Sequence, residues 1–187
     1  MAITIPVLPA GSQTTVTLKS SAIDQTPYLG GPVQRVGRMG DRWGYAIELR
    51  PMFASQSRPL IALLLQGLTA KVLCPVVLQG IDLRGQTDVV ATAGAGRTIT
   101  VAGLMDRKSV GQFFSLVSNR VRYLHQITSI SGQTVTCNPP LKVVIAGGEL
   151  MEFAAPKIEG FLEGNEQSWN TGLASNVGLS FKVNEAS

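Results

Sequence analysis

The chain has 187 residues, enough for one domain of ordinary size or for one domain that carries a small inserted lobe. Charged residues make up 15% of it, against roughly 25% in typical globular domains, so either the surface is unusually apolar or other subunits cover part of it. No apolar run approaches the roughly 18 residues of a membrane span, and the N-terminal MAITIPVLPAG lacks a secretory signal's basic region and cleavage site; we therefore expect no membrane contact and folding in a cytoplasm.

The first part of the chain predicts two strands joined by a long arm. Residues 14–23 alternate between apolar and polar side chains, as a strand does. Residues 25–42 hold six glycines and prolines, too many for a helix, and are too long for a hairpin turn. We expect an extended arm there, because a connection of this length usually serves a function or a partner. Residues 43–52 form the clearest strand, since every second side chain from Trp43 to Leu49 is apolar.

One segment, residues 57–67, carries good helix signals. Ser57 is suited to cap its N-terminus, Pro59 to occupy its first turn, and Gly67 to take a left-handed conformation at its C-terminal end. Leucine and isoleucine occupy nearly all sides of this helix, so we expect it to be buried on a sheet or between subunits.

The middle of the chain predicts a separate small lobe. An apolar strand at 70–83 contains Pro75, which removes a ladder donor and predicts an edge, a bulge or a break at that point. The small residues of 87–96 then read as a link. Beyond them short strands recur about every 8–12 residues, which is typical of a small barrel or sandwich. We place a small barrel at residues 93–148.

The predicted fold is therefore mainly β, with a β-sandwich-like domain, one flanking helix and a small inserted β-barrel lobe. The sandwich-like domain combines residues 1–90 with residues 150–187. Its last part, residues 157–186, reads as two strands that flank a loop rich in glycine and asparagine. Twenty glycines and ten prolines supply the many turns that such a chain needs.

The sequence lacks the clusters of histidine and cysteine residues that catalytic and metal sites usually contain. His125 is the only histidine, and it alternates with Tyr123 and Ile127 on one strand face, which predicts a packing position. Cys74 and Cys137 lie far apart in apolar segments and are expected to be buried free thiols. Structural zinc needs about four close Cys or His ligands, so we expect no metal, no cofactor and no enzyme activity.

Charge is segregated along the sequence. Residues 94–148 hold six lysines and arginines against one aspartate, whereas residues 149–187 hold six glutamates against two lysines. Segregated signs allow copies of a subunit to dock head to tail, which generates rings or filaments. We expect the arginines of the arm to meet acidic groups of a neighbouring subunit. The residues assigned to this interface are Arg35, Arg38, Arg42, Glu159, Glu163 and Glu166.

Several stretches share their order and character with one family. They are LGGPVQRVGRMGDRWGYAIELRPM (29–52), LLLQGL (63–68), GRTITVAGL and GQFFSLVSNRVRYLHQITSISGQTVTCNPPLK within 96–142, and GLSFKVNEA (178–186). In these stretches the chain resembles the distal tail or tail-tip structural proteins of tailed bacteriophages and prophages. The resemblance implies a virion protein, assembled in the bacterial host cytoplasm, that forms a homo-oligomeric ring, commonly a hexamer, between the tail tube and the hub or tip. It implies no cofactor, and no nucleic-acid partner except DNA passing through the lumen.

Two other functions fit parts of the sequence. Arginines lie beside aromatic residues in RVGRMGDRWGY (35–45) and SNRVRYLH (118–125), as in single-strand nucleic-acid binders that are built on small barrels. A carbohydrate-binding tip module is the other alternative. The residues on which these alternatives depend are Arg120 and Arg122 for nucleic acid, and Trp43 and Trp169 for stacking against a sugar.

Overall fold

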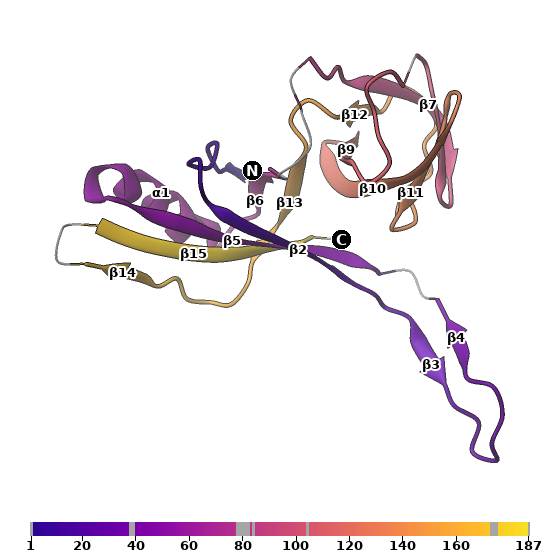
Figure 1. Cartoon of the computed structure of the whole chain (residues 1–187), viewed down its shortest axis with the longest axis horizontal. Helices are drawn as coiled ribbons and strands as arrows, with labels where there is room; N and C mark the ends of the chain where they lie inside the picture. The colour runs from indigo at the N-terminus through magenta and orange to yellow at the C-terminus, as the bar shows by residue number, and fades with distance from the viewer. Residues whose placement is uncertain are drawn as a thin grey trace.

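The fold is mainly β, as the sequence predicts, and combines a large sheet, a helix and a closed barrel (Figure 1). The computed structural model describes residues 2–37, 40–77, 83, 85–103, 105–172 and 176–186. Along the chain the strands of the barrel lie between two groups of strands of the large sheet. A two-stranded arm extends from the sheet away from both lobes (Figure 1).

Within the described residues the large sheet has seven strands. Six of them follow the order β1–β6–β13–β15–β5–β2, and β14 pairs with β15. The strands are β1 (Ile3–Thr4), β2 (Gln13–Lys19), β5 (Arg42–Phe53), β6 (Val72–Pro75), β13 (Lys157–Leu162), β14 (Trp169–Thr171) and β15 (Asn176–Glu185). Every second residue of β5 from Trp43 to Leu49 is buried, which confirms the predicted face of that strand.

The large sheet curls so that β5 faces the end of β6, and this encloses a sandwich-like core. Tyr45 lies on β5, three strands from β6 in the sheet order, yet its hydroxyl donates to the Val77 carbonyl oxygen at 3.2 Å and accepts from the Val77 N–H at 3.1 Å. Burial raises the pKa of Tyr45, so the phenol stays protonated and can make both bonds. Leu60 and Leu64 of the helix pack into the same core.

The helix, α1 (Ala54–Gly67), begins three residues earlier than the sequence predicts, because β5 runs directly into it at Phe53. Ser57 does not cap it. The Ser57 hydroxyl lies inside the helix and donates to the Ala54 carbonyl oxygen at 3.2 Å, a bond that serine often makes within helices. One face of the helix is buried, and Leu65 on the other side is 44% exposed. The buried residues are Ser57, Leu60, Leu64 and Gly67.

The predictions for Pro59 and Gly67 are wrong in detail. Pro59 lies inside the helix, beyond its first turn, because of the earlier start. Gly67 is the last helical residue and is not left-handed. An added Cβ at Gly67 would lie 2.7 Å from Val72 Cγ1 and 3.1 Å from Leu162 Cδ1, so this glycine allows the close packing of α1 against β6 and β13.

Six described strands close into a barrel in the order β10–β11–β8–β7–β12–β9. They are β7 (Val89–Ala95), β8 (Thr98–Val101), β9 (Phe113–Ser118), β10 (Val121–Ser131), β11 (Thr134–Asn138) and β12 (Leu150–Glu152). The strands of the barrel thus extend beyond the expected range 93–148 at both ends. Much of the segment interpreted as a link is strand β7, whose small residues have a packing role: an added Cβ at Gly94 would lie 2.8 Å from Ile145 Cδ1.

Strand β10 has one face in each of two cores. Ile127 lies in the barrel core with Tyr123 packed against it, and His125 is buried, which confirms the face predicted for these three residues. Leu124 packs into the core of the sheet domain together with Phe113 of β9. The Phe113 ring meets the Trp43 ring edge-on, with centroids 5.0 Å apart. The two lobes therefore share apolar contacts as well as a chain connection.

The C-terminal part holds three strands where the sequence predicts two. The additional strand, β14, lies within the stretch interpreted as a loop and pairs with β15 through Trp169–Leu179 and Thr171–Val177. All three residues of β14 are exposed, so it has no apolar alternation that would reveal it in the sequence.

The two lobes meet along one edge of β10. Strand β11 pairs with β10 only from Gln126 onward, so among the described strands none lies beside the N–H groups of Arg122 and Leu124 on that edge. Two glutamates of the sheet domain take this place. Glu159 Oε2 accepts from the Arg122 N–H at 3.0 Å, and Glu185 Oε1 accepts from the Leu124 N–H at 3.0 Å. Both side chains are buried, with 7% and 2% exposure.

Lysines balance the charge of these buried carboxylates. Lys142 Nζ lies 2.9 Å from Glu185 Oε2, which also accepts from the Trp43 N–H at 3.3 Å. Lys71 Nζ lies 3.6 Å from Glu159 Oε1. A buried carboxylate is tolerated only when it is paired and hydrogen-bonded, and each of these two glutamates meets that condition.

Gly160 permits the close approach of the strands that carry the two glutamates. It pairs with Glu185 on β15 and with Val72 on β6, so β13 has a neighbour on both sides at this point. An added Cβ at Gly160 would overlap the carbonyl oxygen of Asn184. The glycine therefore helps to place Glu159 beside Glu185 at the lobe junction.

We expect Glu185→Gln to destabilise the protein by about 3 kcal/mol. The amide loses the ion pair with Lys142, and its NH₂ group must face one of the buried N–H donors that the carboxylate now accepts from. Urea unfolding followed by circular dichroism measures this change. Glu163→Gln is the matched control, since Glu163 also pairs with a lysine at 2.8 Å but is solvent-exposed. Equal losses in the two variants would contradict the role assigned to the junction.

Both cysteines are buried and free, as the sequence predicts. Cys74 lies in β6, which ends at Pro75, where the sequence predicts an interruption; residues 78–82 of the predicted strand lie outside the described residues. Burial raises the pKa of Cys74 to about 12 and that of Cys137 to about 11. Both thiols are therefore protonated and unreactive at neutral pH.

The native protein is expected to show no rapid reaction with a disulfide reagent such as DTNB at pH 8, because both thiols are buried and protonated. After unfolding in guanidinium chloride both should react. Absorbance of the released thiolate measures the number of reacting groups. Rapid labelling of either cysteine in the native state would show that its strand opens easily.

Candidate functional site

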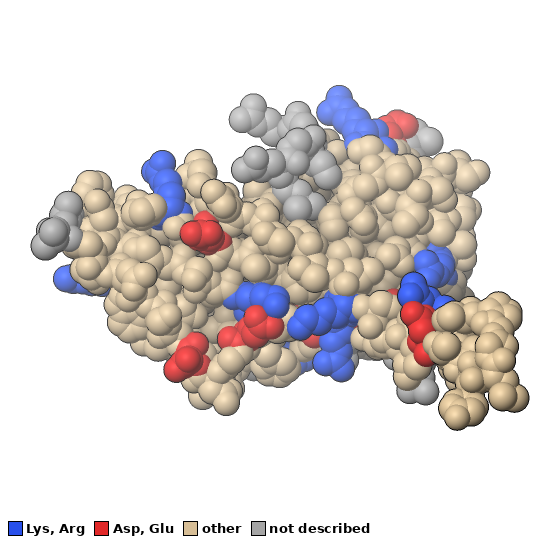
Figure 2. Space-filling model, turned by 60° about the horizontal axis from the view of Figure 1, so that its bottom comes forward, with Lys and Arg blue, Asp and Glu red and all other residues tan. Residues whose placement is uncertain are grey.

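The arm projects into solvent. It consists of β3 (Ile23–Gln25) and β4 (Gln34–Val36), which continue from β2 and into β5. At its tip Tyr28 is 101% exposed and Leu29 is 92% exposed. Figure 1 shows the arm pointing away from the sheet and the barrel, and Figure 2 shows its far end without charged side chains. An isolated two-stranded hairpin is at best marginally stable, and exposed apolar side chains mark contact surfaces.

The arginines assigned to the interface lie on and near the arm. Arg35 crosses the hairpin to Asp24, with Nε and Nη2 donating to the two carboxylate oxygens at 2.6 and 2.8 Å. This hydrogen bonding lowers the pKa of Asp24, and Nη1 of Arg35 has no acceptor among the described residues. Arg42 lies at the base of the arm and lines a recess on the sheet domain that also contains Lys71. Arg38 lies outside the described residues.

The three assigned glutamates have different surroundings. Glu159 is buried at the lobe junction, where its carboxylate already binds a backbone N–H and Lys71 of the same chain. Glu163 is exposed and accepts from Lys182 at 2.8 Å and from Asn184 at 3.3 Å, which lowers its pKa. Glu166 is also exposed. Only Glu163 and Glu166 are therefore accessible to another molecule.

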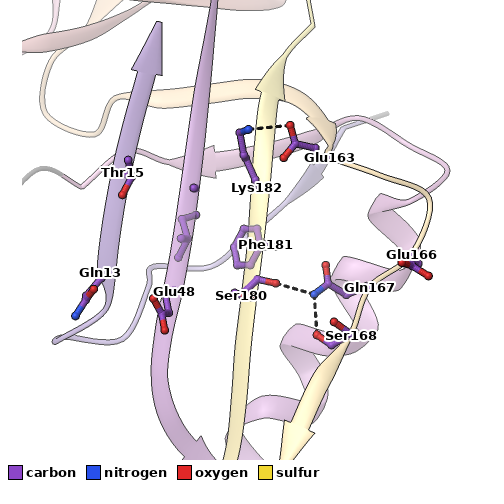
Figure 3. A pocket seen from close by; sticks show the side chains of 12 residues that line it. Gln13, Thr15, Glu48, Glu163, Glu166, Gln167, Ser168, Ser180, Phe181 and Lys182 are labelled. Carbon is purple, nitrogen blue, oxygen red and sulfur yellow. Dashed lines mark hydrogen bonds and ion pairs between the residues drawn. The ribbon is translucent and has the colours of Figure 1, made fainter. Parts of the chain in front are cut away.

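Glu163 and Glu166 line a recess of about 390 Å³ on the outer face of the large sheet, which we call the polar groove (Figure 3). Glu48 of β5 lies in it as well, and Lys182 is the one basic residue among its lining. Gln167 forms part of its wall, and its amide donates to the carbonyl oxygens of Ser168 and Ser180. The polar groove thus presents acceptor oxygens and a net negative charge to solvent.

His125 is a core residue with an unusual polar environment. It is 1% exposed, and its Nδ1 lies 3.1 Å from the Pro139 carbonyl oxygen, so Nδ1 carries the hydrogen. Its Nε2 has no hydrogen-bond partner among the described residues. Burial, with a smaller effect of the positive charge of Lys142, lowers the pKa of His125 to about 4. The imidazole is therefore neutral near pH 7 and is closed off from solvent.

The depressed pKa of His125 predicts a pH-dependent stability. The unfolded chain binds a proton near pH 6.5 and the folded chain near pH 4, so stability is complete above about pH 6.5 and falls as the pH drops toward 4. The expected loss is about 3 kcal/mol over this window. His125→Asn keeps a donor near the Nδ1 position but does not titrate, so this part of the pH dependence should vanish. Urea unfolding at pH 7 and pH 4.5 compares the two proteins; an equal loss in both would rule the histidine out as its source.

Of the four residues on which the two alternative functions depend, Arg122 and Trp43 are held within the chain, whereas Arg120 and Trp169 are exposed. Arg122 donates from Nε and Nη2 to Glu152 at 3.0 Å each, so it is held against the barrel. Trp43 is 5% exposed and cannot stack on a ligand. Trp169 is 43% exposed, but it lies opposite the buried Leu179 and so faces away from the polar groove. Neither alternative therefore gains a formed site.

Sequence reasoning missed two sets of important residues. Glu185 gives no signal in the sequence, because its buried position depends on a contact with Leu124, 61 residues away. Tyr28 and Leu29 were detectable, since they are large apolar residues within a turn-rich segment that offers no strand or helix to bury them.

Among the described residues no group of three or more His, Cys, Asp or Glu side chains is placed to hold a metal ion. None of the described helices is long and apolar enough to cross a membrane. Comparison of the chain with models of known protein families and with curated protein sequences finds no match.

Proposed function

We propose that this chain is a structural subunit of a bacteriophage tail, in which copies associate head to tail into a ring that joins the tail tube to the hub or tip. The observation that carries the proposal is the arm, whose apolar tip at Tyr28 and Leu29 has almost no contact with its own chain. Such a projection gains stability only when another molecule covers it. The resemblance of residues 29–52 and 96–142 to distal tail proteins is the basis for proposing a ring, six subunits and a location in the virion.

The distribution of charged side chains also supports head-to-tail association. Arg35 and Arg42 lie on the arm and at its base, and Glu163 and Glu166 lie on the outer face of the large sheet. In the proposed ring the arginines of one subunit, Arg38 among them, meet those two glutamates of the next. Glu159 is left out of this interface because its carboxylate is buried within the chain. The role needs no cofactor and no catalytic group.

Sedimentation velocity of the purified protein tests this proposal. The wild type is expected to form a closed oligomer, with six subunits favoured. Replacing residues 26–33 by Asn-Gly, a sequence that closes a two-residue hairpin, should leave a folded monomer. Arg42→Glu should weaken the oligomer and leave the fold intact, since Arg42 is exposed.

Circular dichroism and thermal unfolding of each variant provide the control for folding. A wild type that stays monomeric at high concentration would overturn the proposal. So would a variant without the tip of the arm that assembles as well as the wild type.

A further inference from the structure

A second recess lies at the end of the large sheet opposite the arm. The arm continues from the Lys19 end of β2 and the Arg42 end of β5, whereas this recess begins at Arg50 near the other end of β5. It has a volume of about 440 Å³, and we call it the apolar groove. Its apolar walls are formed by Pro6, Val7, Pro51, Phe53, Pro59 and Leu63.

The apolar groove is open to solvent and matched in chemistry to the tip of the arm. Val7 and Phe53 on its walls are 82% and 63% exposed. Among the described residues of its lining Arg50 is the one that is charged, and none of them is a carboxylate. Residues 25–34 of the arm likewise carry no charge. The leucine and tyrosine of the tip are the side chains that such a groove takes up best, because Arg50 and Asn176 can bond the tyrosine hydroxyl.

The other described recesses do not suit an uncharged tip. The polar groove contains three glutamates, and the recess at Arg42 contains Lys71 and Glu185. A third, at the base of the arm itself, contains arginine, lysine and aspartate side chains. Burying an uncharged apolar tip against any of these would strip charged groups of water without pairing them. Of these four recesses, the apolar groove is therefore the one that fits.

The spacing of charges agrees with this placement. On the arm, Arg35 is paired with Asp24, and Leu29 lies five residues beyond Asp24, at most about 17 Å in extended chain. On the sheet, Glu48 of the polar groove is five residues before Phe53 of the apolar groove, about 17 Å along β5. An arm that lies along the outer face of β5 with its tip in the apolar groove thus brings Arg35, with its unused Nη1, to the polar groove.

We propose that the arm of one copy lies along the outer face of the next copy's large sheet, with Tyr28 and Leu29 in the apolar groove and Arg35 beside the polar groove. This inference rests on the proposed ring and names the surface that receives the arm. Since arm and groove lie at opposite ends of the sheet, the contact is heterologous: each copy gives its arm to one neighbour and receives the arm of another. Such contacts close into a ring when the rotation between copies allows it.

Two single substitutions and their mixture test the placement. Leu29→Glu removes the tip but keeps the groove, and Val7→Glu does the reverse. Each variant alone is expected to self-associate about tenfold or more weakly than the wild type, because a charge would be buried in an apolar contact. An equimolar mixture should form a one-to-one dimer that grows no further, since one intact arm meets one intact groove. Val144→Glu is the matched control, because Val144 is also a valine with 77% exposure but lies in the barrel lobe; its assembly should equal that of the wild type.

Cross-linking locates the contact. Leu29→Cys combined with Val7→Cys should give a ladder of disulfide-linked oligomers on mild oxidation, whereas Leu29→Cys combined with Val144→Cys should not. The two natural cysteines do not interfere, because both are buried.

The outcomes separate this inference from the proposed function. If the wild type forms a ring and Val7→Glu leaves it intact, or if the mixture stays monomeric, the apolar groove is not the receiving surface while the ring stands. If the wild type is a monomer, both proposals are overturned. A mixture that yields the one-to-one dimer, with a ladder from the Leu29 and Val7 pair alone, supports the groove.

Discussion

The arrangement of this molecule depends on two buried carboxylates at the junction of its lobes. Glu159 and Glu185 accept the backbone N–H groups of Arg122 and Leu124 on an edge of β10 that β11 does not reach. A buried N–H without a partner is costly, so the barrel is most stable when the sheet domain lies against this edge. Conversely, each glutamate is tolerable in the interior because it has a donor and a lysine.

This junction also fixes what is left exposed. With the barrel held against β13 and β15, the outer face of β5 and the far end of the sheet remain open to solvent, and the arm extends beyond both lobes (Figure 1). The exposed surface is therefore divided into a projection with an uncharged tip at one end, a polar strip along the sheet, and a mainly apolar recess at the other end. Surfaces that differ in this way favour association of unlike patches over a two-fold dimer.

The sequence predicts the parts of the fold that depend on local pattern. Alternation identifies the buried face of β5 and the barrel-facing side of β10, and turn residues reveal both the barrel and the arm. Features that depend on distant neighbours are not predictable in this way. From the sequence Gly94 is predicted to belong to a link, but in the structure it allows Ile145 to pack closely against β7. Gly67 is predicted to be a helix cap, but in the structure it allows Val72 to pack closely against α1.

The candidate site shows the same limit. Glu159, Glu163 and Glu166 look alike in the sequence, yet Glu159 is buried by Arg122, 37 residues away, and the other two are exposed. The arm was recognisable from its glycines and prolines. The apolar groove was not, because it combines residues near Pro6, the end of β5, the start of α1 and Asn176, which only the folded chain brings together.

Electron microscopy of the purified wild-type protein tests the central claim most directly, because class averages show both whether copies associate and how. We expect closed rings in which successive subunits are related by a single rotation and each is bridged to the next by its arm. Isolated monomers, or dimers related by a two-fold axis with both arms free, would contradict it.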